Sequence, residues 1–345
     1  MEGEHVCVVG DARDMASVDD GEIDLVVTSP PYPMIEMWDD AFASLNPAIA
    51  DALEDGDADR AFDLMHEELA AVWAELARVV RSGGIVCLNV GDATRSVDGS
   101  FSQFPNHARV VEHMTDLGFR PLPDVLWRKP TNKASKFMGS GMLPTNAYVT
   151  LEHEYILVFR KGGETRQFEP GCERRYESAY FWEERNEWFS DVWTDIAGTL
   201  QRFDSGDARN RSAAYPVEIP YRLINMYSVY GDTVLDPFWG TGTTTLAAML
   251  AGRDSVGVEL DPDVAASFDD RLEDLPARSE ALVDGRLERH REFVERRQES
   301  GDDVGYEAEH YDFPVVTKME REIRFYEAET VEETDSGYRV TYQPR

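Results

Sequence analysis

The sequence predicts an α/β protein with a mixed, mostly parallel β-sheet, and three observations carry this prediction. Runs of apolar, β-branched residues recur along the chain and alternate with segments of helical periodicity. These runs are nearly continuous, which is typical of parallel strands covered on both faces. In the second half, a strand, a glycine-rich turn, a helix and another strand follow one another as a βαβ unit.

The first part of the chain predicts four strands and two helices. The strand-like runs are HVCVVGD (5–11), IDLVVTS (23–29), IVCLNV (85–90) and EYILVFRK (154–161). From Ala61 onward, apolar residues recur at helical spacing, and we expect this helix to end at Gly83. A second helix is expected to end at Gly118.

The alternation is interrupted once and then resumes. Residues 162–214 mix charges of both signs with many aromatic residues and show no period. We expect an inserted target-recognition region there, and irregular packing under the main sheet is the alternative. A helix, the strand TVLDPF, the helix GTTTLAAMLAGR and the strand SVGVEL follow. The remaining residues predict a heavily charged, solvated helix and a hairpin around DSG on a small appendage. The chain is therefore divided into 1–161, 162–214, 215–275 and 276–345.

The charge balance is strongly acidic. Asp and Glu number 67 against 34 Lys and Arg, which gives a net charge of −33, and only five of the basic residues are lysine. The acidic residues are spread along the whole chain, which is typical of a cytoplasmic protein from an extreme halophile. In molar salt the Debye length is only about 3 Å, so this self-repulsion is screened.

Three classes of protein are disfavoured by the composition. No run of about 18 apolar residues predicts a membrane span, and the acidic start of the chain does not resemble a signal peptide. Three cysteines, scattered singly, form neither a disulfide framework nor a metal-ligand spacing, and no other metal site is expected. A cytoplasmic location is the simplest expectation.

A glycine loop near residue 240 indicates a nucleotide-like cofactor. Gly240 and Gly242 let the backbone approach a ligand, and the following helix offers free N–H groups. Glu259 ends the next strand and is placed to accept hydrogen bonds from ribose hydroxyls. Asp236 precedes the loop, where it would oppose a pyrophosphate but suits ammonium and sulfonium charges. S-adenosylmethionine (SAM) is therefore favoured over NAD.

Together with this loop, the stretch TSPPY (28–32) resembles the catalytic motif of amino-group DNA methyltransferases. LDPFWGTGTTTLAA resembles the cofactor motif of that family, and the catalytic motif precedes it, as in the β class. The resemblance covers about residues 5 to 275. It implies a Rossmann-like class I SAM-dependent methyltransferase fold with permuted motif order. A serine in this motif is the usual form in enzymes that methylate N4 of cytosine.

The resemblance assigns catalysis to Ser29, Pro30, Pro31 and Tyr32. The target amine is a poor nucleophile, because its lone pair is delocalised into the base. Ser29 Oγ and the Pro30 carbonyl can accept its two N–H groups and direct the lone pair at the methyl group. The prolines fix that carbonyl, and Tyr32 offers a ring on which an extruded base stacks.

The remaining expected contacts fall into two sets. The cofactor residues implied by the motifs are Asp11, which would hold the adenine, and Thr28, Asp236, Pro237, Phe238, Gly240, Gly242, Thr243, Thr244 and Glu259. The segment 126–142 carries basic residues and no acid, which indicates contact with DNA phosphates. The DNA-binding residues expected there are Arg128, Lys129, Lys133 and Lys136.

Several alternatives stay open at the level of sequence. Adenine N6 presents the same amine geometry as cytosine N4, and RNA could replace duplex DNA as the substrate. A nucleotide-dependent oxidoreductase would use the glycine loop but leave SPPY unexplained. TSPPYPMIEMWD is also similar to archaeal enzymes that modify a short palindrome such as CTAG. A cognate restriction endonuclease or none, and a monomer or a homodimer, are equally compatible with the sequence.

Overall fold

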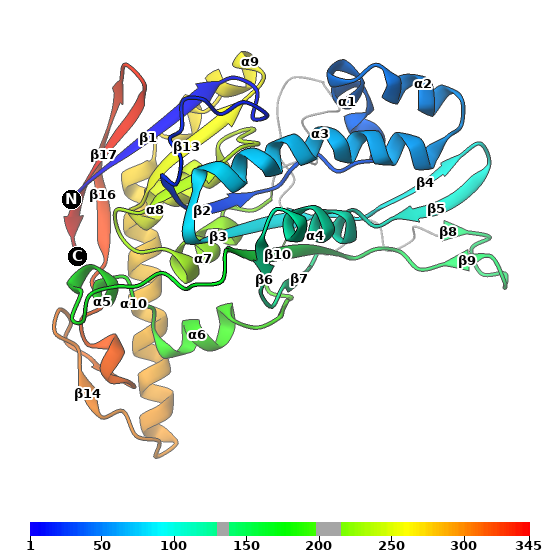
Figure 1. Cartoon of the computed structure of the whole chain (residues 1–345). Coiled ribbons are helices and arrows are strands. Elements are labelled where there is room, and N and C mark those ends of the chain that lie inside the picture. Colours follow the sequence, from blue (N-terminus) through cyan, green and yellow to red (C-terminus); the bar gives the residue numbers. More distant parts are fainter. Residues whose placement is uncertain (130–137, 198–214) are drawn as a thin grey trace.

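Five parallel strands form the centre of the main sheet (Figure 1). The computed structural model describes residues 1–129, 138–197 and 215–345. The central strands lie in the order β3 (Val80–Val90), β2 (Ile23–Thr28), β12 (Thr233–Asp236), β13 (Asp254–Glu259) and β1 (Glu2–Val9). This is the mixed, mostly parallel sheet that the apolar runs predicted, because the strands on both flanks are mainly antiparallel to their neighbours.

Each flank extends the sheet with a different part of the chain. Beyond β3 lie β10 (His153–Lys161), β7 (Val125–Arg128) and β11 (Val192–Trp193), with β6 (Phe119–Pro121) also paired to β10. Beyond β1 lie β17 (Gly337–Pro344) and β16 (Tyr326–Thr334). The hairpin predicted around DSG is thus present, and it joins the main sheet as its edge rather than standing apart from it.

The two chain termini lie beside each other at this edge. The backbone N–H of Tyr342 donates to the carbonyl of Met1 at 2.8 Å, and the Met1 ammonium donates to the carbonyl of Tyr342 at 3.2 Å. Antiparallel pairing of β1 with β17 runs from Glu2 opposite Thr341 to Val6 opposite Gly337. The first and last segments therefore close the sheet on this side together.

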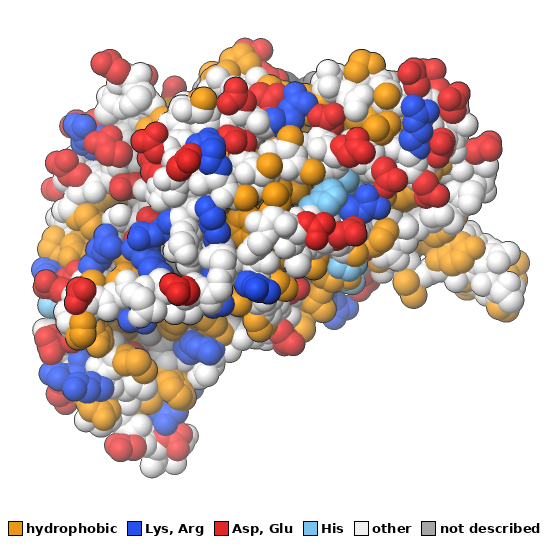
Figure 2. All heavy atoms as spheres, in the orientation of Figure 1, with side chains coloured by type: hydrophobic (Ala, Val, Ile, Leu, Met, Phe, Trp, Pro, Cys, Tyr) orange, Lys and Arg blue, Asp and Glu red, His pale blue; other side chains and the backbone are white. Residues whose placement is uncertain are grey.

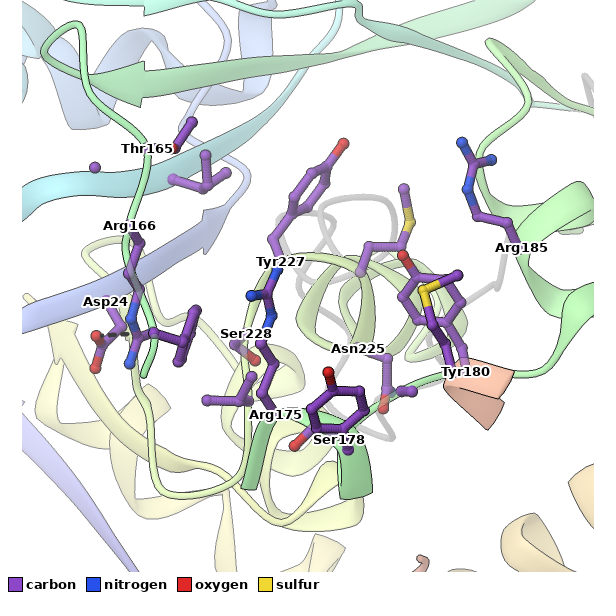
Figure 3. Close-up of a pocket in the computed structure, with 18 of the residues that line it drawn as sticks. Asp24, Thr165, Arg166, Arg175, Ser178, Tyr180, Arg185, Asn225, Tyr227 and Ser228 are labelled. Carbon is purple, nitrogen blue, oxygen red and sulfur yellow. Dashed lines mark ion pairs between the residues drawn. The ribbon is translucent and has the colours of Figure 1, made fainter. Parts of the chain in front are cut away.

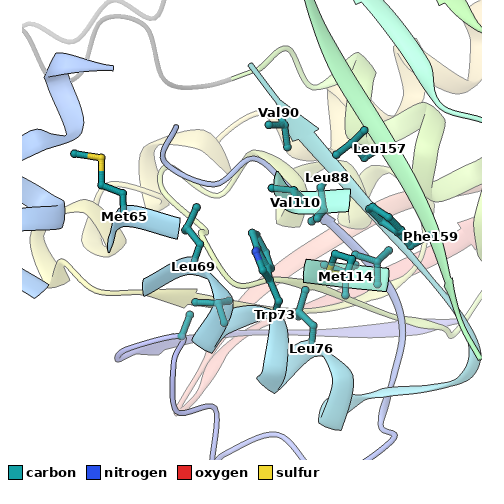
Figure 4. Packing of buried hydrophobic residues seen from close by; sticks show 14 of the residues in the cluster. Met65, Leu69, Trp73, Leu76, Leu88, Val90, Val110, Met114, Leu157 and Phe159 are labelled. Carbon is teal, nitrogen blue, oxygen red and sulfur yellow. The ribbon is translucent and has the colours of Figure 1, made fainter. Parts of the chain in front are cut away.

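Helices cover both faces of the sheet, and alternating strand residues supply the two cores. On one face α3 (Ala58–Val79) and α4 (Asn106–Asp116) pack Trp73 and Met114 against Leu88 and Phe159 (Figure 4). On the other face α7 (Glu218–Tyr227) and α8 (Thr243–Ala251) pack against the alternate strand residues. Both faces of the central strands are thus buried, which explains their continuous apolar sequences.

The remaining elements surround this core. They are η1 (Glu36–Trp38), α1 (Asp39–Leu45), α2 (Ala48–Glu54), α9 (Pro262–Ala266), η3 (Asp269–Arg271), η4 (Lys318–Glu320) and the two-stranded pairs β4 (Ala93–Val97) with β5 (Ser100–Phe104), β8 (Met138–Gly139) with β9 (Ala147–Tyr148), and β14 (Tyr306–Glu307) with β15 (Pro314–Val315). Figure 1 shows β4–β5 and β8–β9 projecting from the body on the same side as α1 and α2. No helix in the described part of the chain is long and apolar enough to span a membrane.

One predicted boundary was wrong. The first long helix ends at Val79, four residues before Gly83, and Gly83 lies inside β3. Gly83 adopts φ +79°, and a Cβ there would lie 2.8 Å from the backbone nitrogen of Arg166. The glycine is therefore required by a close approach of residues 164–166 to the start of β3, and not by a helix end.

The described part of the insert is ordered by tryptophans and by one buried ion pair. It forms α5 (Glu173–Glu177), α6 (Trp182–Trp188) and β11, and Trp188 and Trp193 are buried in the core. Glu184 of α6 accepts two hydrogen bonds from Arg286, at 2.6 and 2.7 Å. Both side chains are buried, so the pair ties the insert to a helix about 100 residues further along the chain.

Arg286 lies on α10 (Leu275–Glu299), the charged helix predicted from the sequence. The prediction of a solvated surface helix was wrong, because one face of α10 is buried at Leu275, Ser279, Val283, Arg286, Leu287, His290 and Val294. Arg286 also donates to the Tyr221 hydroxyl at 3.0 Å, which links α10 to α7. The high charge of α10 therefore does not mean that the helix is solvated. Its buried Arg286 and His290 can pack inside the protein because each has an acidic partner.

The acidic composition is expressed at the surface. Figure 2 shows acidic side chains over most of the visible face, with lysine and arginine side chains concentrated in its left half. With a net charge of −33, repulsion between these carboxylates opposes the compact state at low ionic strength.

We expect the melting temperature to rise by roughly 10 °C or more between 0.1 and 3 M KCl, because the Debye length shrinks from about 10 Å at 0.1 M to about 3 Å at 1 M. Differential scanning calorimetry across a KCl series measures this. Most of the rise should occur below about 1 M, where the screening length changes most. A melting temperature that stays constant or falls over this range would contradict the interpretation.

Arg286→Met should lower the free energy of unfolding by about 3–5 kcal/mol, because it leaves the carboxylate of Glu184 buried without a partner. Urea denaturation followed by tryptophan fluorescence measures this. Arg296→Met on the exposed side of the same helix serves as the control and should change stability by less than about 0.5 kcal/mol. The double variant Arg286→Met with Glu184→Leu should recover most of the loss; a double variant as unstable as the single one would exclude the unpaired carboxylate as the cause.

Candidate active site

The TSPPY motif and the glycine loop meet at the carboxyl ends of two adjacent strands. β2 ends at Thr28 and β12 ends at Asp236, and the strands pair in parallel with Val26 opposite Leu235. The connection from β2 to β3 runs through α3, which covers one face of the sheet, whereas α8, the helix after β12, covers the other. The chain therefore leaves these strands in opposite directions, and such a switch point is where open α/β sheets bind ligands.

A buried carboxylate joins the two motifs. The hydroxyl of Thr28 donates to Asp236 Oδ1 at 2.5 Å, and the hydroxyl of Thr244 lies 2.6 Å from Asp236 Oδ2. The backbone N–H of Phe238 also donates to Oδ1, at 3.1 Å. Burial raises the pKa of Asp236 to about 6 in spite of these hydrogen bonds, which favour the charged form, and Glu259 adds a smaller repulsion. At neutral pH the buried Asp236 carboxylate therefore favours the binding of a positively charged group.

Two glycines of the loop adopt a backbone conformation that other residues rarely take. Gly240 has φ +54° and Gly242 has φ +72°, both in the left-handed region. A Cβ on Gly242 would lie 2.4 Å from the ring of Phe268, whereas one on Gly240 would meet only the Phe238 carbonyl, at 3.8 Å. Gly242 is therefore required for packing against the protein, and Gly240 leaves open space where a ligand could approach.

Glu259 braces this loop. Its Oε2 accepts the backbone N–H of Gly240 at 2.8 Å, and its Oε1 accepts that of Asp261 at 2.9 Å. Burial raises the pKa of Glu259, and both hydrogen bonds oppose that rise. Each carboxylate oxygen has two lone pairs, so the side chain keeps capacity to accept from a ligand. Glu259 therefore binds the backbone of the glycine loop, and the sequence additionally predicts a contact with ribose for it.

Asp11 lies on the same edge of the sheet but already has a partner. It follows β1, whose Val9 pairs with Glu259 of β13, so the two carboxylates come from adjacent strand ends. Arg13 forms an ion pair with Asp11 at 2.6 Å and another with Glu68 at 2.5 Å. The guanidinium lowers the pKa of Asp11. The Asp11 carboxylate is partly exposed at this edge, and the contact with adenine that the sequence predicts stays a prediction.

The other predicted cofactor residues differ in what their side chains contact. The hydroxyl of Thr244 is buried between Asp236 and the hydroxyl of Tyr215, 2.5 Å from the latter. The hydroxyl of Thr243 accepts from Arg271 at 3.0 Å, and Phe238 packs edge-on against Trp73. Pro237 is buried. These side chains shape the loop from within, so their contribution to a ligand would come through the backbone or through Asp236.

Ser29 and Tyr32 belong to one hydrogen-bond network. The hydroxyl oxygens of Ser29 and Tyr32 lie 2.9 Å apart, and both lie 3.2 Å from the carbonyl oxygen of Asn89. The Tyr32 hydroxyl also donates to Glu154 Oε2 at 3.1 Å. Burial, and then the nearby carboxylate of Glu154, hold the pKa of Tyr32 well above its usual value, so the phenol stays neutral. The motif thus presents two neutral hydroxyls rather than a charged base.

Asn89, Glu154 and Lys129 complete this network, although the sequence predicted no site role for Asn89 or Glu154. The amide of Asn89 donates to the Tyr32 hydroxyl at 2.9 Å and to Glu154 Oε2 at 2.7 Å. Lys129 donates to Glu154 Oε1 at 2.9 Å. Asn89 lies near the end of β3 and Glu154 near the start of β10, which pair in antiparallel fashion. The available signal was a polar residue at the end of an otherwise apolar strand.

The loop after the prolines is fixed by a buried asparagine. The amide of Asn106 donates to the carbonyl of Pro33 at 3.1 Å and to that of Gly91 at 2.9 Å. A Cβ on Gly91 would lie 2.7 Å from the ring of Tyr32, so this glycine lets the tyrosine pack against the end of β3. Within the described residues no hydrogen bond reaches the carbonyl of Pro30. This carbonyl is held by rigid neighbours and remains available as an acceptor.

Two of the four residues that the sequence predicts to contact DNA lie in the described part of the chain. Arg128 is exposed and lies 3.3 Å from Glu152, and Lys129 is engaged with Glu154 beside Tyr32. Lys133 and Lys136 lie outside the described residues. The structure therefore places one of the four basic residues, Lys129, next to the TSPPY motif, through Glu154. The described parts of the chain contain no cluster of three or more His, Cys, Asp or Glu side chains suited to a metal ion.

Comparison with known proteins identifies a family that matches this chain. Residues 23–268 match the DNA methylase family N6_N4_Mtase, which includes both adenine-N6 and cytosine-N4 enzymes. Type II methyltransferase M.MthZI of Methanothermobacter thermautotrophicus is 51% identical over 329 residues, covering 94% of this chain and 91% of that protein. Type II methyltransferase M.MjaI of Methanocaldococcus jannaschii is 47% identical over 279 residues, covering 78% and 91%.

Solved structures agree with this assignment. TTHA0409 of Thermus thermophilus, in complex with S-adenosyl-L-methionine, superimposes with a TM-score of 0.61 at 32% identity, covering 80% of this chain and 94% of that one. PvuII DNA methyltransferase, a cytosine-N4-specific enzyme, shares the fold with a TM-score of 0.53 at 18% identity, covering 82% and 91%. The Rossmann-like methyltransferase fold predicted from the two motifs is confirmed. The chain belongs to the N6_N4_Mtase family of DNA methylases.

Proposed function

We propose that this protein transfers a methyl group from SAM to the exocyclic N4 of cytosine in duplex DNA, at a specific sequence. The observation that supports it most is the arrangement of Ser29 and Tyr32 beside Asp236, at the ends of adjacent strands. One motif is suited to an amine and the other to a cationic cofactor. The serine of TSPPY favours cytosine over adenine within this family.

The residues around the glycine loop fit SAM. Gly240 faces open space that a Cβ would fill, the buried carboxylate of Asp236 suits a cation, and Glu259 retains acceptors for ribose hydroxyls. We assign Asp236, Gly240, Gly242 and Glu259 to the cofactor, with Asp11 toward the adenine. Thr28 and Thr244 hold Asp236 in position. When bound, the cofactor supplies an electrophilic methyl group on a sulfonium.

The protein's part in the reaction is to orient one amine. Ser29 Oγ and the Pro30 carbonyl accept the two N–H groups, so the nitrogen becomes more tetrahedral and its lone pair points away from the base ring. Proline stiffness keeps that carbonyl in place, and Tyr32 stacks on the base after it leaves the duplex. No base deprotonates the amine beforehand. The excess proton leaves after transfer, through Ser29 to water.

The hydroxyl network explains how Ser29 remains ready for this task. The polar partners of Ser29 in the described residues are Tyr32 and Asn89, which hold its side chain at the strand end. Glu154 orients Asn89 and Tyr32 together and is balanced by Lys129. We therefore propose Asn89 and Glu154 as positioning residues, in addition to the catalytic residues expected from the motif.

Nucleoside mass spectrometry of DNA treated with the purified enzyme and SAM identifies the product. We expect N4-methylcytosine and no N6-methyladenine; the reverse result would assign the enzyme to the other branch of the family. An RNA substrate in the same assay should remain unmodified. Sequencing that detects modified bases would give the recognition site, and CTAG is the first palindrome to test.

Ser29→Ala should lower kcat by roughly 100- to 1,000-fold, because one acceptor for the developing charge on the amine is lost. Binding of SAM should change by no more than about threefold, since Ser29 does not contribute to the cofactor site. Transfer of tritiated methyl groups to DNA and calorimetric titration with SAM measure the two quantities. Ser44→Ala, which removes an exposed serine on α1, is the matched control. Unchanged turnover in Ser29→Ala would exclude the proposed role.

The affinity for SAM should fall at acidic pH. The pKa of Asp236 is raised to about 6, and the cationic cofactor favours the carboxylate form, so Kd should be constant above about pH 7. Below pH 6 the Kd should rise by up to about tenfold per pH unit. Asp236→Asn should bind SAM more weakly and lose this step, whereas Asp263→Asn, at an exposed residue of α9, should retain it. Calorimetry between pH 5 and 8 measures both, and a step that persists in Asp236→Asn would point to another group.

A further inference from the structure

A cavity of about 790 Å³ lies away from the proposed methylation site. Its lining includes Asp24 at the start of β2 and Gly83 and Ile85 in the first half of β3. The proposed catalytic residues follow the other end of β2, and the positioning residue Asn89 lies near the other end of β3. Thr28 is four residues beyond Asp24, or roughly 13 Å along the strand. The cavity is therefore at the opposite edge of the sheet from TSPPY and the glycine loop.

The lining of this cavity is basic, in contrast to the rest of the molecule. It contains the four arginines Arg160, Arg166, Arg175 and Arg185, against the two acids Asp24 and Glu320. The whole chain carries −33. In Figure 2, lysine and arginine side chains are more numerous in the left half of the visible face. A local excess of positive charge in so acidic a protein indicates a site for an anion.

Three of these guanidiniums have no carboxylate partner in the described part of the chain. Arg166 is neutralised, because it pairs with Asp24 at 3.2 Å (Figure 3) and with Asp232 at 2.5 Å. Arg160, Arg175 and Arg185 form no such pair. Arg160 also keeps a buried Nε without a hydrogen-bond partner. The cavity thus holds more cationic donors than the described protein uses.

Aromatic rings hold two of the free arginines in place. The guanidinium of Arg175 lies 4.9 Å from the ring centre of Phe168, and that of Arg185 lies 4.0 Å from that of Phe189. A guanidinium stacked on a ring keeps its in-plane N–H groups free, and this fork matches a phosphate. Because such contacts are short and bidentate, they persist in concentrated salt, where long-range attraction is screened.

The same cavity offers surfaces for a planar ring. Figure 3 shows Tyr180 and Tyr227 among its lining residues, on different sides of Asn225. Within the described residues, neither phenol has a hydrogen-bond partner. Asn225 uses its amide nitrogen on the carbonyl of Tyr221, at 2.8 Å, and keeps its side-chain oxygen as an acceptor. Stacking faces next to unused donors and acceptors suit a nucleobase.

We propose that this cavity binds a nucleoside phosphate, as a second ligand distinct from SAM and from the DNA target. Arg160, Arg175 and Arg185 would hold the phosphate groups, and the tyrosines would contact the base. The volume lies within the range of about 300–1,000 Å³ that is usual for small-molecule sites. A nucleotide accounts for the charge and the aromatic lining together, whereas inorganic phosphate accounts for the charge alone.

The test uses the 345-residue chain saturated with SAM, so that the cofactor site cannot take up a nucleotide. Calorimetric titration in 2 M KCl compares the 5′-diphosphates of adenosine, guanosine, cytidine and uridine with the free nucleosides and with inorganic phosphate. At least one diphosphate should bind ten or more times as tightly as its nucleoside and as phosphate. The double variant Arg175→Gln with Arg185→Gln should weaken that binding at least tenfold. Both residues are exposed, so the fold should be retained.

Arg60→Gln with Arg120→Gln removes the same charge at two exposed positions outside the cavity and should change nucleotide binding by less than twofold. Methylation of DNA by the cavity variant should stay within about twofold of the parent, which separates this proposal from the proposed function. Failure of every diphosphate to bind would overturn the proposal, as would phosphate binding as tightly as any nucleotide. A loss of duplex-DNA affinity in the cavity variant would overturn it in favour of a DNA contact.

Discussion

The buried carboxylate of Asp236 is the contact on which the rest of the site depends. It accepts hydrogen bonds from Thr28 at the end of β2 and from Thr244 at the start of α8, and so joins two segments more than 200 residues apart in sequence. Without these hydrogen bonds, the TSPPY loop and the glycine loop would be held next to each other only by a short stretch of parallel pairing between β2 and β12. A buried carboxylate is costly unless its acceptors are satisfied, and three donors satisfy this one.

Much of the fold was predictable because parallel strands buried on both faces leave a simple record in sequence. The five central strands were all predicted, since each is a short apolar run. The site residues at strand ends were predictable for the same reason, because TSPPY and DPFWGTG interrupt such runs. Whether Pro31 and Phe238 take the roles expected from the motif stays a prediction, and Lys133 and Lys136 lie beyond the described residues.

Other features depend on contacts between distant segments of the chain, and no local sequence pattern reveals such contacts. The burial of α10 was missed because Arg286 and His290 make its inner face look polar, and only their partners on α6 reveal that they are satisfied. Asn89 and Glu154 were missed as site residues because their importance arises from the antiparallel pairing of β3 with β10. Gly83 was misassigned because a close approach of residues 164–166 requires a glycine, and a helix end often requires one too.

The pairing of β1 with β17 has a consequence for how the chain could be connected. Because the first and last strands are hydrogen-bonded neighbours, a short linker could join the ends without disturbing the sheet. The backbone would then be a closed ring, and it could be reopened in a surface loop elsewhere. The order in which the two motifs occur along the chain is therefore not imposed by the sheet. What the fold requires is that β2 and β12 lie side by side, and circular permutants would keep that arrangement.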